Sequence, residues 1–235
     1  MRKIETAVIL VGGSGLRMRP LTEDMPKCMV PLQGKPLIYW ILNWLKGYGF
    51  KHIVLGVAYQ KDVIIDYIKQ NNQGLKIDIS EHTVEGETGE GFRLAISRFV
   101  KDEDFLAMNG DEITNLNIKH LEESHLKSNH VATIAVAPMR SPFGILELDG
   151  DDIIGFQEKI LLENTLVSIG VYIFNNQILN FIPTTGSIEK TVFPLLAKKR
   201  LLKAYRLGKD ESWLTINSIK ELSVAEKEFA SIRRT

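Results

Sequence analysis

The chain contains very little cysteine, because Cys28 is the only one in 235 residues. A single thiol cannot form an internal disulfide, which excludes the small disulfide-stabilised scaffolds and is typical of proteins from a reducing compartment. We therefore expect a cytoplasmic protein that is stabilised by a packed core. We expect Cys28 itself to be a structural residue rather than a reactive thiol.

The chain also lacks a long apolar run and a net charge. No segment approaches the roughly 20 apolar residues of a membrane span, and Glu5 interrupts the approach to the first apolar run, so we expect no signal peptide. The 29 basic and 29 acidic residues cancel, which argues against nucleic acid or an anionic membrane as the main partner. The sequence does not determine the oligomeric state and is compatible with a homo-oligomer.

What the sequence does contain is an ordinary globular composition with a clear alternation of strands and helices. Hydrophobic residues make up 44% of the chain and charged residues 25%, as in soluble domains. Apolar runs predict strands at 7–10, 52–58, 76–80 and 105–108, and helical spacing predicts helices at 37–45, 61–70 and 89–99. This alternation implies βαβ units and a mostly parallel sheet, in which ligands bind beyond the carboxyl ends of the strands.

The pattern changes after a predicted helix at 118–128. Extended runs follow at 131–136, 144–148, 153–158 and 167–174, then short helices at 176–181 and 188–199, and a strand at 202–207. Ser218 and Glu221 form a capping-box pattern at the start of a last helix. We expect a single domain, 1–235, whose second half, 131–235, is built as a lid onto the sheet of the first half, 1–130.

A glycine-rich loop follows the first strand. Gly12, Gly13 and Gly15 allow a sharp turn and present bare backbone N–H groups, which can form a concave anion site. Arg17, Arg19 and Lys27 then add positive charge. A glycine turn with exposed basic residues is the alternative, but the strand before the loop and the cations after it favour a polyphosphate site.

Three further segments contain candidate polar residues at predicted strand ends or turns. Asp111, in Asn109-Gly110-Asp111, could hold magnesium through its carboxylate, or could cap a turn. Glu81 precedes the glycine-rich segment 86–91 and could contact a ligand or be a solvated strand end. The adjacent Glu158 and Lys159 could form an ordinary surface charge pair.

The segment 11–36 resembles the opening signature of the sugar-1-phosphate nucleotidylyltransferase family. Val11 and Leu16 depart from that signature, where the family has Ala and Thr; Leu16 lacks a hydroxyl that could bond phosphate but keeps its backbone N–H. The resemblance covers roughly residues 5 to 225. The matching positions are Gly12, Gly13, Gly15, Arg17, Pro20, Leu21, Thr22, Pro26, Lys27, Met29, Pro31, Lys35 and Pro36.

The resemblance implies an α/β fold with a Rossmann-like, mostly parallel mixed sheet flanked by helices and a sugar-binding lid subdomain. It implies an enzyme that joins an NTP to a sugar-1-phosphate, releasing pyrophosphate. Arg17, Lys27 and Asp111 would be catalytic. Residues 1–130 would bind the nucleotide, through Leu10, Gly12, Gly13, Ser14, Gly15, Leu16, Glu81, Gly86, Thr88, Gly89, Asn109 and Gly110.

The same resemblance implies a sugar-phosphate site in residues 131–235. It would be formed by Gly144, Glu158, Lys159, Gly170 and Glu189. The segments Phe143-Gly144 and Phe156 to Lys159, with Thr88-Gly89, are most similar to the glucose-1-phosphate cytidylyltransferase branch. Ile160 stands where that family usually has proline, which leaves the path of this loop open.

The implied cofactor is Mg²⁺, held by Asp111. The family's second metal-binding Asp has no counterpart, because Thr215 and Asn217 occupy the two locations where members place it. Asn217 offers a weaker amide oxygen and could instead be a residue before the Ser218 helix cap. Either it completes the metal site, or the site has a single carboxylate.

The sequence leaves the nucleotide and two alternative functions open. Glu81 accepts hydrogen bonds only, so it would favour a base with an amino group, pointing weakly to CTP or GTP. A transferase for a phosphorylated alcohol such as phosphocholine, and a non-catalytic nucleotide- or sugar-sensing subunit, are the alternatives. A dinucleotide-binding dehydrogenase is disfavoured, because the glycine spacing differs and Ala58-Tyr59 replaces the acidic residue at the end of the second strand.

Overall fold

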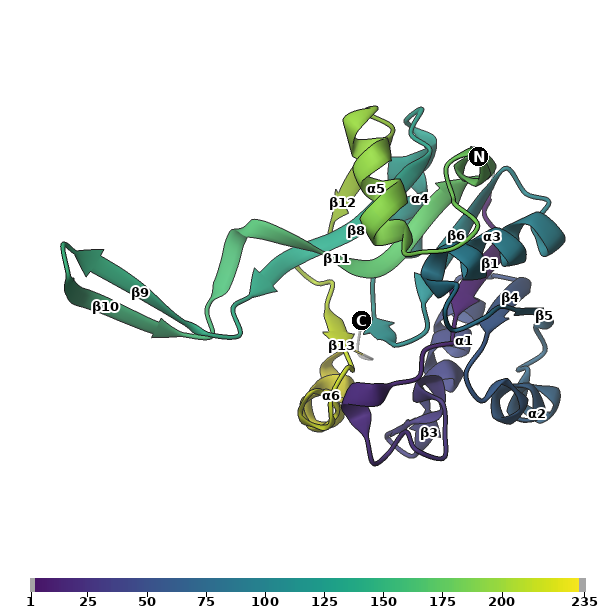
Figure 1. The fold of residues 1–235 in the computed structure, drawn as a ribbon, viewed down its shortest axis with the longest axis horizontal. Helices are drawn as coiled ribbons and strands as arrows, with labels where there is room; N and C mark the ends of the chain where they lie inside the picture. The colour runs from purple at the N-terminus through teal and green to yellow at the C-terminus, as the bar shows by residue number, and fades with distance from the viewer. Residues whose placement is uncertain (1–2, 233–235) are drawn as a thin grey trace.

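The computed structural model describes residues 3–232 and is built around a seven-stranded sheet (Figure 1). The strand order is β12-β8-β11-β6-β1-β4-β5. Mostly buried apolar residues form the central strands of this sheet, as the sequence predicts. The strands of the sheet are β1 (Thr6–Leu10), β4 (His52–Val57), β5 (Lys76–Glu81), β6 (Asp104–Asn109), β8 (Ala132–Arg140), β11 (Leu161–Asn175) and β12 (Leu202–Arg206).

The sheet is mixed and mostly parallel. Strand β1 pairs in parallel with β4 and β6, β4 with β5, and β12 with β8, whereas β11 runs antiparallel to both β6 and β8. Strand β5 is an edge strand, as its alternation of apolar and polar residues predicts. The carboxyl ends of β1, β4 and β6 therefore lie along one side of the sheet, where the glycine loop and Asp111 follow.

Helices cover both faces of the sheet and create two apolar cores. One core contains Ile41, Ile64, Leu121 and Phe229 from four helices, and the other contains Phe92 and other residues of two helices. This three-layer arrangement confirms the predicted α/β class. The helices are α1 (Leu37–Gly47), α2 (Lys61–Asn71), α3 (Glu87–Phe99), α4 (Ile118–Leu126), α5 (Ile188–Lys198) and α6 (Ile219–Ile232). Among the described residues, no helix is long and apolar enough to cross a membrane.

Two short strand pairs were not predicted, because strands of two or three residues leave no periodic signal. Strands β2 (Pro31–Leu32) and β3 (Lys35–Pro36) form one pair. Strand β7 (Glu112–Thr114) pairs antiparallel with β13 (Trp213–Thr215). The second pair matters for the site, because it ties the segment after Asp111 to the segment before Asn217.

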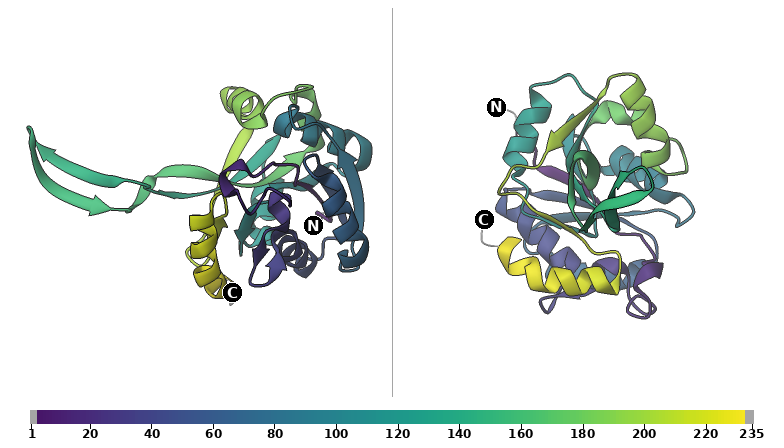
Figure 2. Two further views of the ribbon diagram at one scale, coloured as in Figure 1. Left: turned by 60° about the horizontal axis from the view of Figure 1, so that its bottom comes forward. Right: turned by 90° about the vertical axis from the view of Figure 1, so that its left-hand side faces the viewer.

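The chain between β8 and β11 forms a projecting arm instead of a lid over the sheet. Strands β8 and β11 run out of the sheet together, and β9 (Gly144–Asp149) and β10 (Asp152–Glu158) form a hairpin beyond them. The views agree that this hairpin stands away from the body (Figures 1 and 2). The expected lid subdomain is therefore not confirmed.

Candidate functional site

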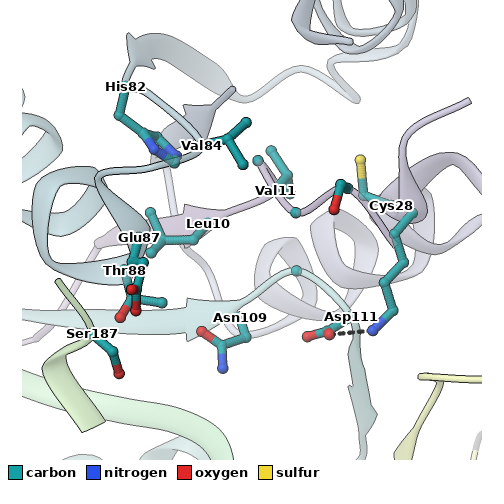
Figure 3. Close-up of a pocket in the computed structure, with 15 residues that line it drawn as sticks. Leu10, Val11, Cys28, His82, Val84, Glu87, Thr88, Asn109, Asp111 and Ser187 are labelled. Carbon is teal, nitrogen blue, oxygen red and sulfur yellow. Dashed lines mark hydrogen bonds and ion pairs between the residues drawn. The ribbon is translucent and has the colours of Figure 1, made fainter. Parts of the chain in front are cut away.

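A cavity of about 420 Å³ lies at the carboxyl ends of β1 and β6 (Figure 3). It is closed on the far side by the entry of α3 and by Ser187, which precedes α5. Its walls combine backbone of the glycine loop with polar side chains from five separate segments. The lining residues are Leu10, Val11, Gly12, Gly13, Ser14, Lys27, Cys28, His82, Val84, Glu87, Thr88, Asn109, Gly110, Asp111 and Ser187.

The glycine loop is fixed to the neighbouring strand at its start. Val11 N–H donates to the Gly56 carbonyl at 2.8 Å, and Tyr59 N–H donates to the Gly12 carbonyl at 3.2 Å. A Cβ at Gly12 would lie 2.8 Å from Ala58 Cβ, so only glycine fits this approach. The loop amides of the cavity wall are therefore held in place without side chains in front of them, as an anion site requires.

The far end of the loop is fixed by Thr22. Gly15 adopts a left-handed conformation with φ of +61°, and the buried Thr22 hydroxyl donates to its carbonyl at 2.7 Å. Gly15, Leu16 and Arg17 lie outside the cavity wall, and Leu16 is exposed. The predicted phosphate loop thus lines the cavity through residues 12–14, with 15–17 continuing along its outside.

Four predicted residues from separate parts of the chain meet at one edge of the cavity. The Lys27 ammonium, at the start of the short 3₁₀ segment Lys27–Met29, donates to Asp111 Oδ2 and, at 2.6 Å, to Asn217 Oδ1. The Lys27 and Asp111 side chains are only 11% and 26% exposed. Arg17 Nη2 also donates to Asn217 Oδ1, at 3.0 Å. This cluster places two cations, one carboxylate and one amide oxygen next to the glycine loop.

The amide of Asn217 is oriented by Thr215. Asn217 Nδ2 donates to Thr215 Oγ1 at 2.5 Å, which turns Oδ1 towards Lys27 and Arg17. The backbone N–H of Asn217 donates to Glu221 Oε2 at 2.7 Å, so the helix-entry role is present as well. The two departures from the family pattern, Thr215 and Asn217, therefore act together.

The side-chain oxygen atoms of this cluster are suitable ligands for a magnesium ion. Asp111 Oδ2 and Asn217 Oδ1 both accept from the single Lys27 ammonium, so the two oxygens face a common point. One carboxylate and one amide oxygen are hard ligands, and magnesium usually takes few protein ligands with water and phosphate oxygens completing its shell. Among residues 3–232 no group of three His, Cys, Asp or Glu side chains gathers in a metal-binding arrangement.

Glu112 is a buried carboxyl behind this cluster that the sequence did not single out. It is 8% exposed, and Trp213 Nε1 donates to its Oε2 at 2.6 Å. Burial raises the pKa of Glu112 to about 8, with the negative charge of Asp111 as the next cause. Gly170 packs against it with φ of +71°, and a Cβ there would lie 2.9 Å from Glu112 Cγ. The predicted sugar-site glycine thus leaves room for this carboxyl.

Replacing Glu112 by glutamine should remove a pH dependence of stability. Below pH 4.5 the carboxyl is neutral in both states; between about 4.5 and 8 it is ionised only in the unfolded chain, so rising pH destabilises the native state. The difference in the free energy of unfolding between Glu112→Gln and wild type should therefore shift in favour of the variant from pH 5 to pH 8. The shift should be at most about 1.4 kcal/mol per pH unit. Urea unfolding without added metal measures this.

Glu81→Gln, at an exposed strand end, is the matched control for loss of one carboxyl. A difference between Glu112→Gln and wild type that stays constant from pH 5 to pH 8 would show that Glu112 does not titrate in this range.

The other end of the cavity is formed by His82 and the entry of α3. His82 Nδ1 donates to the Thr83 carbonyl at 2.9 Å, because that oxygen can only accept. Nε2 is buried and has no hydrogen-bond partner among the described residues. Glu81, by contrast, lies outside the cavity wall and forms an ion pair with Lys61 at 2.5 Å.

The entries of α3 and α5 are joined by Glu189. Its Oε2 accepts from Thr88 Oγ1 at 2.8 Å and from Ser187 Oγ at 2.6 Å. Gly89 N–H donates to the Gly186 carbonyl at 2.7 Å, and a Cβ at Gly89 would lie 2.3 Å from that oxygen. The contacts of Glu189, Thr88 and Gly89 therefore hold the starts of α3 and α5 together at this wall of the cavity. Gly86 precedes α3 and lies outside the cavity lining.

The remaining predicted sugar-phosphate residues lie on the arm. Gly144 begins β9 and packs under Phe156, where a Cβ would lie 2.4 Å from the ring. Glu158 and Lys159 are exposed and lie 3.9 Å apart at the base of the hairpin. The structure does not bring these three residues to the cavity of Figure 3.

Six lining residues were missed as functional candidates: Val11, Cys28, His82, Val84, Glu87 and Ser187. Val11 and Cys28 adjoin predicted residues, so their neighbours could have indicated them. Cys28 is 2% exposed, and burial raises its pKa to about 12, which agrees with the expected structural thiol.

The chain belongs to the nucleotidyl transferase family, whose family model matches residues 6–231. It is 33% identical over 225 residues to the mannose-1-phosphate guanyltransferase of Yarrowia lipolytica, covering 91% of this chain and 61% of that protein. It is 31% identical over 177 residues to the D-glycero-alpha-D-manno-heptose 1-phosphate guanylyltransferase of Campylobacter jejuni, covering 74% of this chain and 77% of the relative. The chain thus spans about three fifths of the longer relative.

Solved structures share the fold. HddC from Yersinia pseudotuberculosis, complexed with GMP-PN, superposes with a TM-score of 0.75 at 25% identity, covering 96% of this chain and all of that one. The inositol-1-phosphate CTP transferase of T. maritima gives a TM-score of 0.75 at 20% identity, with 98% and 96% coverage. These likenesses confirm the expected mostly parallel mixed sheet flanked by helices.

Proposed function

We propose that this chain is a sugar-1-phosphate nucleotidyltransferase that converts an NTP and a sugar-1-phosphate to an NDP-sugar and pyrophosphate. The observation that carries the proposal is the convergence of Lys27, Arg17, Asp111 and Asn217 beside the glycine-loop cavity. Fixed backbone amides, two cations and a pair of oxygen ligands are what two reacting phosphates need.

The reaction would proceed by attack of a phosphate oxygen of the sugar phosphate on the α-phosphorus, with pyrophosphate leaving in line. Such transfers depend on positioning and charge neutralisation rather than on a protein nucleophile. The amides of residues 12–14 would bind the triphosphate. Lys27 would lie between the attacking phosphate and the α-phosphate, and Arg17 would neutralise the departing pyrophosphate.

Asp111 and Asn217 would hold Mg²⁺ once phosphates draw the Lys27 ammonium away from them. The bound ion would neutralise phosphate charge and orient the phosphates. The chain's own contribution is to fix the two oxygens: Asp111 through the turn after β6, and Asn217 through Thr215 and Glu221.

We propose GTP as the nucleotide. The relatives at 31–33% identity are named guanylyl- or guanyltransferases, and HddC was solved with GMP-PN.

For the second substrate we propose a hexose- or heptose-1-phosphate, following the mannose and heptose phosphates in the names of the relatives. Gly170 would lie beside the sugar. The roles implied for Gly144, Glu158 and Lys159 remain predictions. The names of the relatives favour this reaction over the two alternatives, a non-catalytic sensing subunit and a transferase for phosphorylated alcohols.

A pyrophosphate-release assay with the purified chain tests the proposal. Four NTPs are combined with mannose-1-phosphate, a heptose-1-phosphate, glucose-1-phosphate and phosphocholine, each with and without Mg²⁺. We expect GTP with a sugar-1-phosphate to give the highest rate, and only with the metal. Release with phosphocholine alone, or no release with any pair, would contradict the proposal.

Asn217→Asp should lower the magnesium requirement of this reaction. The substitution adds a negative charge next to Asp111 at constant shape, so we expect the magnesium midpoint of pyrophosphate release to fall about tenfold, or about 1.4 kcal/mol. Asn180→Asp, at an exposed position of the 3₁₀ segment Asn176–Asn180, adds the same charge elsewhere and should leave the midpoint in place. An unchanged midpoint in Asn217→Asp would mean that Asn217 serves only the entry of α6.

A further inference from the structure

The arm, residues 141–160, exposes an apolar surface that its own chain does not cover. Phe143 is 75% exposed, Phe156 64%, and Ile153 and Ile154 61% each, with Leu146 and Leu148 about half exposed. The views of Figure 2 show the hairpin away from the body. A two-stranded hairpin is marginal in water on its own, and long exposed apolar strands are association sites.

The arm also differs from the rest of the chain in charge. It contains five of the 29 acidic residues and one of the 29 basic residues, so its formal charge is −4 and that of the remaining chain is +4. Four of the carboxylates, Glu147, Asp149, Asp151 and Asp152, lie at the tip. The arm and the rest of the chain therefore have opposite charge, but the tip of the arm points away from the body of its own molecule.

A basic surface of matching character lies at the opposite end of the sheet order from β5. The segment 190–209, which contains most of α5 and all of edge strand β12, has seven basic residues and no acidic one. Lys198, Lys199 and Arg200 are exposed. Beside them an apolar groove of about 400 Å³ is lined by Ile134, Val136, Ala197, Leu202 and Ala204, together with His130, Arg200 and Lys203.

We propose that the arm of one copy of this chain docks on the basic surface of a second copy. The acidic turn of the hairpin meets Lys198, Lys199 and Arg200, and apolar residues of β9 and β10 cover the groove next to β12. Two copies related by a twofold axis each give one arm and receive one, so the assembly closes as a dimer.

The size of the contact agrees with a stable dimer. On one face of the hairpin Leu146 pairs with Phe156 and Leu148 with Ile153, and these four side chains, losing roughly 100 Å² each, would bury roughly 400 Å² per arm. Each copy gives one arm and receives one, so with a similar area of groove covered it would bury roughly 800 Å², the size per partner of a standard interface. Electrostatic complementarity of this kind fixes which surfaces meet.

Light scattering on a sizing column, with the full-length chain at 1 to 100 µM, measures the assembly. We expect wild type at twice the 26.6 kDa chain mass. Asp151→Lys with Asp152→Lys, and separately Lys198→Glu with Lys199→Glu, should each raise the dimer dissociation constant at least tenfold. Combining all four substitutions swaps the charges and should restore dissociation to within about threefold of wild type.

Lys220→Glu with Lys227→Glu, at exposed positions of α6, is the matched control and should leave the dimer intact. Replacement of residues 145–157 by an Asn-Gly turn should give a monomer. A cooperative thermal unfolding transition of this monomer should show that the body is still folded. A wild-type chain that is monomeric at 100 µM overturns the proposal. A basic surface that binds nucleic acid in place of a second copy would give this monomeric result. A dimer that survives removal of the hairpin, or four substitutions that fail to restore it, also overturns it.

Discussion

Lys27→Ala should reduce turnover by roughly 10³-fold while the chain stays folded. The ammonium lies beside the glycine loop and is held by Asp111 and Asn217, so it is positioned where two phosphates would meet. Removal of one such preorganised donor typically costs 10²–10³ in rate. Because the charge acts mainly as the new bond forms, kcat should fall much more than nucleotide affinity.

The measurement is steady-state pyrophosphate release together with nucleotide binding by calorimetry. Lys35→Ala removes an exposed lysine from the same part of the chain and should leave both quantities nearly unchanged. If Lys27→Ala retains near-normal release, the ammonium has no part in the reaction, and the assignment of the cluster fails.

Asp111→Asn should reduce activity roughly 10²- to 10³-fold and raise the magnesium concentration needed for half-maximal rate. The substitution keeps the shape of the side chain but removes the only carboxylate that accepts from Lys27 in the described structure. Magnesium would then be left with two neutral amide oxygens, which are weaker ligands.

A magnesium titration of pyrophosphate release in wild type and Asp111→Asn measures this effect. Asp66→Asn, at an exposed position of α2, is the control for loss of one carboxylate. Unchanged activity and magnesium midpoint in Asp111→Asn would make Asp111 a turn residue only.

Much of the fold follows from local sequence patterns. The buried runs at 7–10, 52–58 and 105–108 are β1, β4 and β6, because central parallel strands are apolar on both faces. The arm could not be predicted, since its alternation of apolar and charged residues is that of any hairpin. Whether such a hairpin covers a sheet or leaves it depends on the path of β8 and β11 in space.

The candidate site could be predicted in part. The glycine loop, Lys27 and Asp111 stand in a specific order near strand ends, so the sequence identified them. The contact of Lys27 with Asn217 spans 190 residues and depends on the β7–β13 pair, which has no periodic signal. His82, rather than Glu81, faces the cavity, because side chains alternate at the end of a strand and a one-residue difference reverses the face.

The most direct test of the proposed function is phosphorus NMR of the chain with GTP, mannose-1-phosphate and Mg²⁺. We expect equal amounts of free pyrophosphate and of a new diphosphate in which the sugar phosphate is joined to the nucleotide. Both should be lost when either substrate or the metal is omitted. Conversion of GTP without incorporation of any sugar phosphate offered, or no conversion at all, would contradict it.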